Sequence, residues 1–212
     1  MKRLALVLLA GSALAACQTA PAANAGFLTS YDGLTTRDDT LRASIRERRD
    51  EAAANAVEQV YLEPSVLVAG AGDALSEADR ALVLREVDRQ VCYEMSERFT
   101  IVDSATNAAR VRTAVTGINP TGAAGSGVAA VANVLIPGPG TLRVPGTTGG
   151  LAAEAELVAP GGMQVAALAW ARNANVVGTD SPSLSRVGDA LQMAEPFGDA
   201  VGDAFAPTGR AV

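Results

Sequence analysis

The sequence predicts an α+β fold, a two-layer sandwich in which a mostly antiparallel sheet of four or five strands packs against one or two helices. Residues 77–98 carry apolar side chains at helical spacing, which predicts a long amphipathic helix. Residues 151–159 and 163–172 flank a Pro-Gly-Gly turn, an arrangement typical of a β-hairpin. After a leader and loop-like stretches are set aside, about 150 residues remain, enough for one core, so we expect a single domain.

The first residues have the organisation of a secretory signal: a basic start, an apolar run over residues 4–13 and small residues at the exit. The run closes with Leu14, Ala15, Ala16 and Cys17. These four residues resemble the lipobox of bacterial lipoproteins. The resemblance implies that the Cys17 sulfur receives a diacylglycerol, that the bond before it is cut, and that the new N-terminus receives a fatty acid such as palmitate.

Two other interpretations of the leader are open. A transmembrane helix needs about 20 apolar residues, and residues 4–16 fall short of that length. An ordinary signal cut near Ala16 would leave Cys17 unmodified. Lipoproteins of the inner membrane often have Asp directly after the cysteine, whereas this chain has Gln18. In a two-membrane bacterium we therefore expect an anchor in the outer membrane, on its periplasmic face.

These features divide the chain into a signal peptide (1–16), a lipidated tether (17–25), a single α+β domain (26–206) and a flexible tail (207–212). Within the domain, residues 117–150 are expected to form a Gly/Pro-rich loop. Loops of this length are often functional, so we expect contacts with partners or with other copies there.

The composition argues against several classes of function. Loss of the leader removes two of the 17 basic residues, against 23 acidic ones, which disfavours nucleic-acid binding. The chain has no histidine, which excludes Ser–His–Asp and Cys–His catalysis and removes the commonest metal ligand. No Gly-Lys-Ser/Thr phosphate loop and no Asp-x-Asp-x-Asp-Gly calcium loop occurs. We therefore expect no enzyme, no cofactor and no bound metal.

An apolar signature follows the tether: Gly26-Phe27-Leu28-Thr29-Ser30-Tyr31-Asp32-Gly33-Leu34. We expect Phe27, Leu28, Tyr31 and Leu34 to pack the emerging chain onto the domain; the alternative is an exposed patch that recognises a partner. The pattern Gly-Phe-Leu-x-x-Tyr-x-x-Leu resembles the opening of a family of bacterial lipoproteins that share a domain of unknown function. That family supplies no catalytic residues.

Residues 38–57 are predicted as the first helix, with a heavily charged exposed side. Its expected buried positions are Leu41, Ile45, Ala52 and Ala56. Arg46, Arg48 and Arg49 interleave with acidic residues, which favours a solvated face over contact with acidic lipid headgroups. Residues 59–68 follow as a strand that Pro64 interrupts at an edge or bulge.

The helix at 77–98 has the clearest signals. Ser76 is a candidate N-cap, with Asp79 three residues later as in a capping box. The apolar stripe comprises Leu84, Val87, Val91 and Met95, with Ala81 and Cys92 alongside. If Cys17 carries lipid, Cys92 has no partner within the chain. We expect it to be buried as a small apolar residue, the alternatives being a reactive thiol or an intermolecular disulfide.

Strands are expected at 99–103 and 110–118, followed by the hairpin. A three-residue hairpin loop places one set of side chains on one face: Glu154, Glu156, Gln164 and Arg172. It places a second set on the opposite face: Leu151, Ala153, Leu157, Val165 and Ala167. A loop one residue shorter would reverse the faces of one strand, but the three-residue loop separates polar from apolar side chains better, so we expect the three-residue loop.

A last helix is expected to begin with Leu184, Val187 and Leu191, and Pro196 should stop or kink it. Phe197, Val201 and Phe205 can continue it for a weaker turn or two. The pattern Gly198-x-x-x-Gly202 is a packing motif of membrane helices and carries little weight outside one.

One charged group is expected to come together: Glu154 and Glu156 with Arg110 and Arg112, because residues two apart on a strand share a face. Paired carboxylates can carry acid–base chemistry. No nucleophile, cofactor loop or metal cluster accompanies them, so we expect a solvent-facing ladder of ion pairs worth about 0.2–1 kcal/mol each.

The sequence thus predicts an envelope lipoprotein that acts as a non-enzymatic interaction or assembly module. The alternative is a carrier of a small apolar or lipid-like ligand, held between sheet and helices beside Trp170. The expected partners are the membrane, through lipid on Cys17, and envelope proteins or further copies of the chain.

Overall fold

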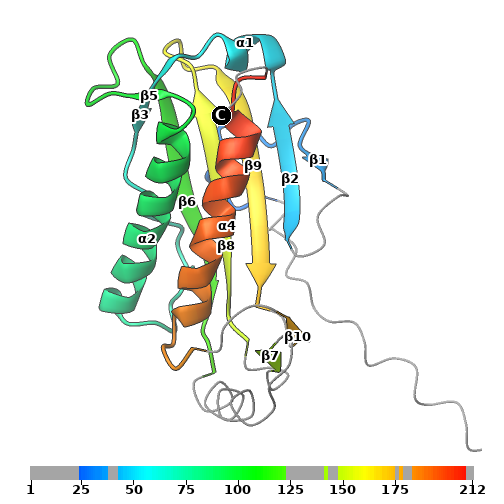
Figure 1. Ribbon diagram of the computed structural model, residues 1–212, viewed down its shortest axis with the longest axis vertical. Coiled ribbons are helices and arrows are strands. Elements are labelled where there is room, and N and C mark those ends of the chain that lie inside the picture. The colour runs from blue at the N-terminus through cyan, green and yellow to red at the C-terminus, as the bar shows by residue number, and fades with distance from the viewer. Residues whose placement is uncertain are drawn as a thin grey trace, which may run out of the picture.

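The computed structural model describes residues 24–37, 43–122, 141–142, 148–174, 177–178 and 183–208. These residues form an open, mixed sheet and three helices, so the predicted α+β class is confirmed (Figure 1). The helices are α1 (Glu51–Asn55), α2 (Glu77–Ser96) and α4 (Gly188–Phe205). None of the helices in the described ranges combines the length and the apolar character needed to cross a membrane.

The main sheet has eight strands, more than the four or five predicted. Its order is β1 (Thr35–Thr36), β2 (Ser44–Arg49), β9 (Gln164–Asn173), β8 (Gly150–Val158), β6 (Ala109–Asn119), β3 (Gln59–Leu62) and β5 (Thr100–Ile101), with β4 (Val66–Leu67) also paired to β6. A separate pair joins β7 (Thr141–Leu142) and β10 (Val177–Gly178). The sheet is mixed because β3 runs parallel to both β5 and β6, and β4 runs parallel to β6.

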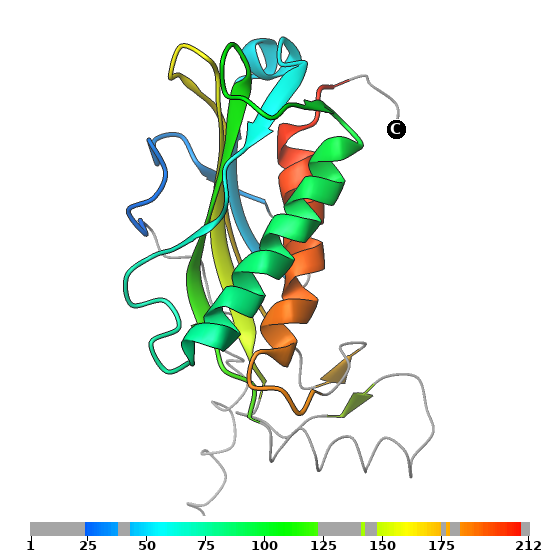
Figure 2. The ribbon, with the colours of Figure 1, turned by 90° about the vertical axis from the view of Figure 1, so that its left-hand side faces the viewer.

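The sheet is covered on both faces. Helices α2 and α4 lie side by side on one face, and the N-terminal segment crosses the other (Figure 2). We call residues 24–34 the N-terminal strap. The core lies between helices and sheet, where Trp170 of β9, 1% exposed, packs against Phe197 of α4 with ring centroids 5.6 Å apart. The indole therefore lies within the core.

The helix predicted at 38–57 is wrong over most of its length. Residues 44–49 form β2, which pairs antiparallel with β9, and the remaining helix is only α1, capped by the Asp50 side chain accepting from Ala53 N–H. Ile45 is buried, but Ala52 and Ala56 are exposed. Alternation puts the side chains of Arg46 and Arg48 on the strap face and Arg49 on the helix face. Cross-strand pairing with β9 outweighs the local helix propensity.

The hairpin of β8 and β9 forms as predicted, but a bulge changes half of its face assignments. Val158 pairs with Gln164, whereas Leu157 pairs with Ala166, so the register shifts by one residue at the hairpin end. Glu154, Glu156 and Gln164 share the strap face as expected. Beyond the bulge the faces of β9 are reversed: Ala167 pairs with Glu156, and Arg172 pairs with Leu151.

Helix α2 follows the predicted stripe and cap. Ser76 accepts a hydrogen bond from Asp79 N–H (3.1 Å), and Val87, Val91 and Met95 are buried against the sheet. The expectation that Cys92 is buried is wrong: its thiol is free and exposed. It follows Val91 by about 100° around the helix, which takes it off the buried stripe.

Helix α4 runs through Pro196, which the sequence predicted as a stop or kink. Phe197, Val201 and Phe205, all beyond the proline, are 0% exposed, so their packing holds the helix together. The helix begins after Leu184, which is 70% exposed. Gly198 and Gly202 face α2: a Cβ at Gly198 would lie 3.1 Å from backbone atoms of Gln90. The Gly-x-x-x-Gly pattern therefore serves close helix packing in this domain.

The connection predicted as a loop at 117–150 lies mostly outside the described residues. The connection is shorter than predicted at both ends, because β6 continues to Asn119 and β8 already starts at Gly150. They are tied to the start of α4 by the fully buried Asp189, which accepts from Gly149 N–H (2.6 Å) and whose N–H donates to Thr121 Oγ1 (3.1 Å).

Candidate functional site

The N-terminal strap docks on the sheet at Glu154 and Glu156 of β8. The Tyr31 hydroxyl shapes the strap internally, because it accepts hydrogen bonds from the N–H groups of Phe27 (3.0 Å) and Leu28 (3.2 Å). Gly33 turns the chain toward β1 with φ +74°, a conformation that favours glycine. A Cβ at Gly33 would lie 3.2 Å from the Arg48 side chain, so a larger residue would crowd it.

Glu156 is the centre of the dock and is fully buried. Its carboxylate accepts from Thr29 N–H (2.7 Å), the Thr29 hydroxyl (3.0 Å), Gln164 Nε2 (2.7 Å) and the Arg112 guanidinium. The same Gln164 amide donates to Ser30 O (3.2 Å), and Arg48 donates to Gln164. One strap residue, Thr29, thus binds through two groups a buried carboxylate whose charge Arg112 balances.

Glu154 forms the second contact with the strap. Its Oε2 accepts a hydrogen bond from the Tyr31 hydroxyl (2.7 Å), and the residue is 1% exposed. Burial raises the pKa of Glu154, although the Tyr31 hydrogen bond and the nearby Arg46 oppose that shift. Burial also raises the pKa of Tyr31, with its bond to Glu154 acting in the same direction. Both pKa shifts therefore favour the protonated forms of Glu154 and Tyr31, relative to the same groups in water.

Arg112 joins this dock to the predicted cluster of charges. Its guanidinium lies 5.0 Å from the centre of the Phe27 ring, a cation–π contact between strap and sheet. Its Nε also lies 3.5 Å from Glu63, which pairs with Arg110 at 3.6 Å. Of the four residues expected to meet, Arg112 and Glu156 are directly opposite and paired, whereas Arg110 turns to Glu63.

The expectation of a solvent-facing ion-pair ladder at Glu154 and Glu156 is wrong, because the strap covers both carboxylates. Of the four signature residues singled out in the sequence, Leu28 is 6% exposed, and Phe27, Tyr31 and Leu34 are half-buried. The lipobox residues Leu14, Ala15, Ala16 and Cys17 lie outside the described residues.

The sequence analysis missed Thr29, whose hydrogen bonds come from a backbone N–H and a small hydroxyl. One signal for a covered face was available. On the strap face, β9 carries the small residues Ala167, Ala169 and Ala171, which are at most 1% exposed. A strand that is apolar or small on both faces is typical of a sheet covered on both sides.

The dock holds the N-terminal strap against the sheet. Glu156 receives four donors, so its acceptor positions are already used by hydrogen bonds within the protein. Across the described ranges, no group of three or more His, Cys, Asp or Glu side chains is placed to hold a metal ion.

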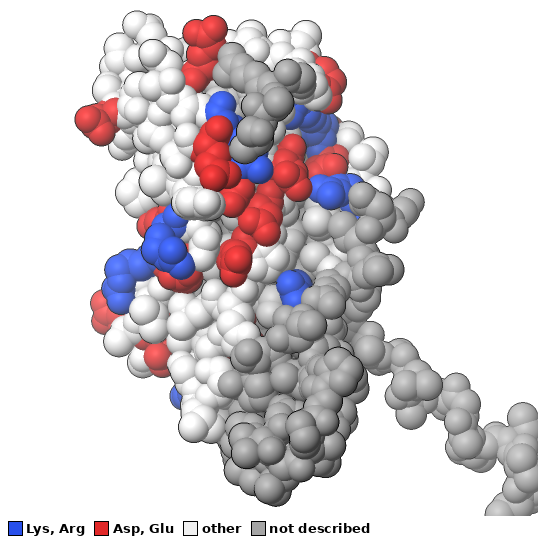
Figure 3. Space-filling model, viewed as in Figure 1, with Lys and Arg blue, Asp and Glu red and all other residues white. Residues whose placement is uncertain are grey.

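A second set of charges follows the seam between α2 and α4, where acidic side chains gather on the helical face (Figure 3). Glu94 of α2 is 8% exposed and pairs with Arg98 (2.6 Å), which also lies 3.6 Å from Asp203 of α4. The pKa of Asp199 is raised to about 6. Partial burial is the largest cause, followed by repulsion from Glu94, a hydrogen bond with Glu94, and repulsion from Glu195 and Asp203.

Asp199→Asn is expected to raise stability at pH 7.5 and to leave it unchanged near pH 4. Because the pKa is raised on folding, from 3.8 to about 6, this group favours the folded state in acid, and that contribution is lost as the pH rises through 6. Since the carboxylate is exposed and screened, we expect a gain of about 1 kcal/mol. Thermal unfolding between pH 4 and 8 measures it, with the exposed Asp73→Asn as control. A parallel pH profile for Asp199→Asn and the parent would contradict it.

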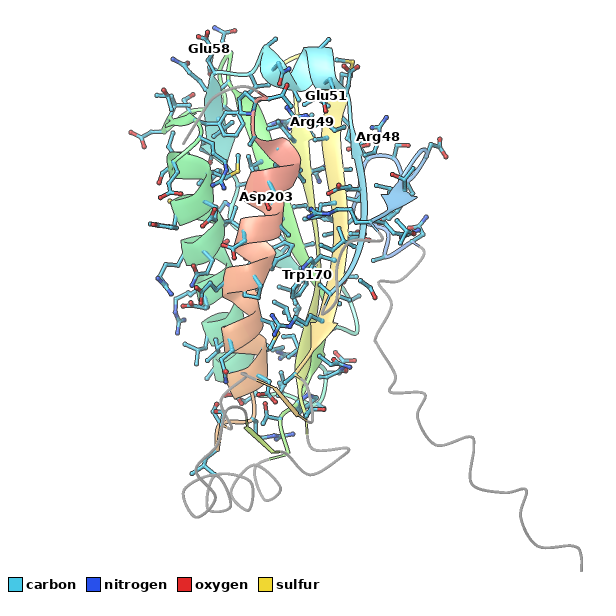
Figure 4. All side chains as sticks on the ribbon, turned by 45° about the vertical axis from the view of Figure 1, so that its right-hand side comes forward. Arg48, Arg49, Glu51, Glu58, Trp170 and Asp203 are labelled. Atoms are coloured by element: carbon cyan, nitrogen blue, oxygen red, sulfur yellow. The ribbon has the colours of Figure 1, made fainter. Side chains whose placement is uncertain are left out.

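A third polar cluster closes the end of the sheet where α1 meets the end of α4 (Figure 4). Arg49 donates to Ala204 O (3.2 Å) and Asn55 Oδ1 (2.8 Å), and its Nε lies 3.2 Å from Glu51. Asn55 in turn binds Thr208 through both its amide and its carbonyl oxygen. These groups hold β2, α1 and the C-terminal residues together, and their polar atoms are used in these contacts.

Among solved structures, the chain is similar to a PelC dodecamer from Paraburkholderia phytofirmans, at 10% identity and a TM-score of 0.42, over 78% of this chain and 96% of the PelC chain. A PelC variant from the same organism gives 12% identity and a TM-score of 0.42, over 77% and 98%. These scores support no inference about assembly or activity. No curated protein sequence matches the chain.

A family model covers most of the chain. The match runs over residues 23–201, from just before the strap to Val201 in the last part of α4, and the family is described as a protein of unknown function, DUF3313. It therefore includes the strap, the sheet and both long helices. The chain belongs to the DUF3313 family.

Proposed function

We propose that this protein is a bacterial envelope lipoprotein, anchored through lipid on Cys17 to the outer membrane, whose periplasmic domain is a non-enzymatic interaction or assembly module. The observation that carries the proposal is the docking of the strap onto Glu154 and Glu156. A tether that emerges from a docked strap leaves the domain at a defined point rather than from a loose end.

The short tether between Cys17 and the strap would keep the domain close to the membrane. Residues 18–23 separate Cys17 from the strap, and an extended chain of that length reaches about 25 Å. A domain held within that distance presents its surface to envelope proteins at a restricted height and orientation. Two or more acyl chains make such an anchor effectively permanent, whereas one chain binds only marginally.

The anchor is tested by comparing Cys17→Ser with Cys92→Ser in membrane fractionation. Cys17→Ser should move the protein wholly from the membrane to the soluble fraction without changing its melting temperature, because the residue precedes the docked strap in the sequence. Cys92→Ser is the matched control and should stay in the membrane. Intact mass of the purified protein should show a diacylglyceryl group and a fatty acid. Equal partitioning of the two variants, or an unmodified N-terminus, overturns the anchor.

The interaction role is tested separately by crosslinking in intact cells followed by mass spectrometry. A module of this kind should give the same crosslinked envelope protein, or a second copy of the chain, in repeated experiments. If the anchored protein yields no reproducible crosslink while a known envelope complex in the same cells does, the interaction role is wrong and the anchor is unaffected.

A further inference from the structure

A small hollow of about 250 Å³ lies between α2 and the outer strands, on the helix face of the sheet. Its walls are mostly apolar, formed by Leu62, Pro64, Val91, Cys92 and Val111. The hollow exists because Pro64 separates β3 from β4. Ser65 then turns to α2, where its N–H donates to Asp88 Oδ1 (2.8 Å) and its hydroxyl to Leu84 O (3.3 Å).

Thr113 is the uncharged polar residue among those that line this hollow. It lies on β6 between Val111 and Val115, which face the helices, and it is 4% exposed. Its side chain lines the hollow, and its hydroxyl is not among the fully buried atoms that lack a partner, so it is available to a group that enters the hollow.

We propose that this hollow is a binding site for a small, neutral, mostly apolar molecule that carries one hydrogen-bonding group, which pairs with the Thr113 hydroxyl. A cavity of about 150 Å³ holds benzene, so this one has room for on the order of ten non-hydrogen atoms. The inference is independent of the anchor and the interaction role, since it rests on the helix side of the sheet.

The rim of the hollow selects against anions. Asp88 lines it and accepts a hydrogen bond from Ser65 N–H, and its carboxylate forms no ion pair within the described part of the chain. Glu63 lines it as well, although Arg110 and Arg112 lie near that carboxylate. A ligand with a hydroxyl or carbonyl group should therefore bind better than one of the same length with a carboxylate.

Cys92 provides a direct reporter, because its exposed thiol lines the hollow. In the Cys17→Ser chain it is the single cysteine. We expect 1-octanol to slow alkylation of Cys92 by N-ethylmaleimide in a saturable manner and to shift the amide resonances of Val111 and Thr113. Octanoate should do so at least several-fold more weakly. Failure of 1-octanol to protect Cys92 up to its solubility limit, or equal binding of octanoate, overturns the proposal.

Two variants distinguish this site from non-specific surface binding. Thr113→Val keeps the shape of the side chain and should weaken 1-octanol about five-fold, the value of one hydrogen bond. Cys92→Phe fills the mouth from an exposed position and should abolish the amide shifts, whereas Tyr93→Ala, one residue further round α2 and 57% exposed, should leave them unchanged. Full 1-octanol binding by Cys92→Phe, with its melting temperature preserved, would exclude this hollow as the site.

Discussion

Replacing Glu156 by Gln is expected to lower the free energy of unfolding by about 3 kcal/mol and to release the N-terminal strap from the sheet. The carboxylate accepts from Arg112, Gln164 and two groups of Thr29 in a fully buried position. An amide of the same shape offers one acceptor oxygen and turns an NH₂ group toward donors. Breaking a buried charge pair from one side costs about 3–5 kcal/mol, and Glu63 near Arg112 keeps the loss at the lower end.

Urea unfolding measures the stability change, and hydrogen exchange at the Thr29 amide measures release of the strap. Glu154→Gln is the matched control, two residues away on the same face and equally buried. Because burial raises the pKa of Glu154, a neutral side chain is less costly there, and an amide oxygen can still accept from Tyr31. We expect Glu154→Gln to change stability by less than about 1 kcal/mol. Equal losses in the two variants would show that Glu156 has no special role in the dock.

The parts of the fold that could be predicted are those encoded by local periodicity. Helix α2 has a cap at Ser76 and a stripe of Val87, Val91 and Met95, and both are formed as expected. The hairpin of β8 and β9 follows from alternation around a Pro-Gly-Gly turn. In each case the signal lies within about 20 consecutive residues, where spacing alone decides which side chains share a face.

The features that escaped prediction depend on contacts between distant segments. The segment that contains Arg46, Arg48 and Arg49 has the charge pattern of an exposed helix. Its pairing with β9 makes it a strand, in which alternate side chains point to opposite faces. One extra residue at the hairpin bulge reverses Ala167 and Arg172, and no local pattern marks it. The burial of Glu154 and Glu156 depends on Thr29 and Tyr31, more than a hundred residues earlier.

Phe197→Ala is expected to lower the free energy of unfolding by about 4 kcal/mol, because it removes a large aromatic side chain from the centre of the core. Phe197 is 0% exposed, and its ring packs at 59° against Trp170, 5.6 Å between centroids. The loss combines buried apolar surface with a cavity that the neighbouring sheet cannot close. For a domain of this size we expect the melting temperature to fall by roughly 10 °C or more.

The adjacent residue tests whether packing rather than helix propensity holds α4 together. Proline inside a helix removes a backbone hydrogen bond and costs about 3 kcal/mol, yet α4 continues through Pro196 for more than two turns. Pro196→Ala should therefore keep or raise the melting temperature, in the opposite direction to Phe197→Ala. If Pro196→Ala destabilises the protein as much as Phe197→Ala does, the proline ring itself contributes to the core. If Phe197→Ala is harmless, the last turns of α4 are not held by their contact with Trp170, and the packing explanation for a helix that passes its proline fails.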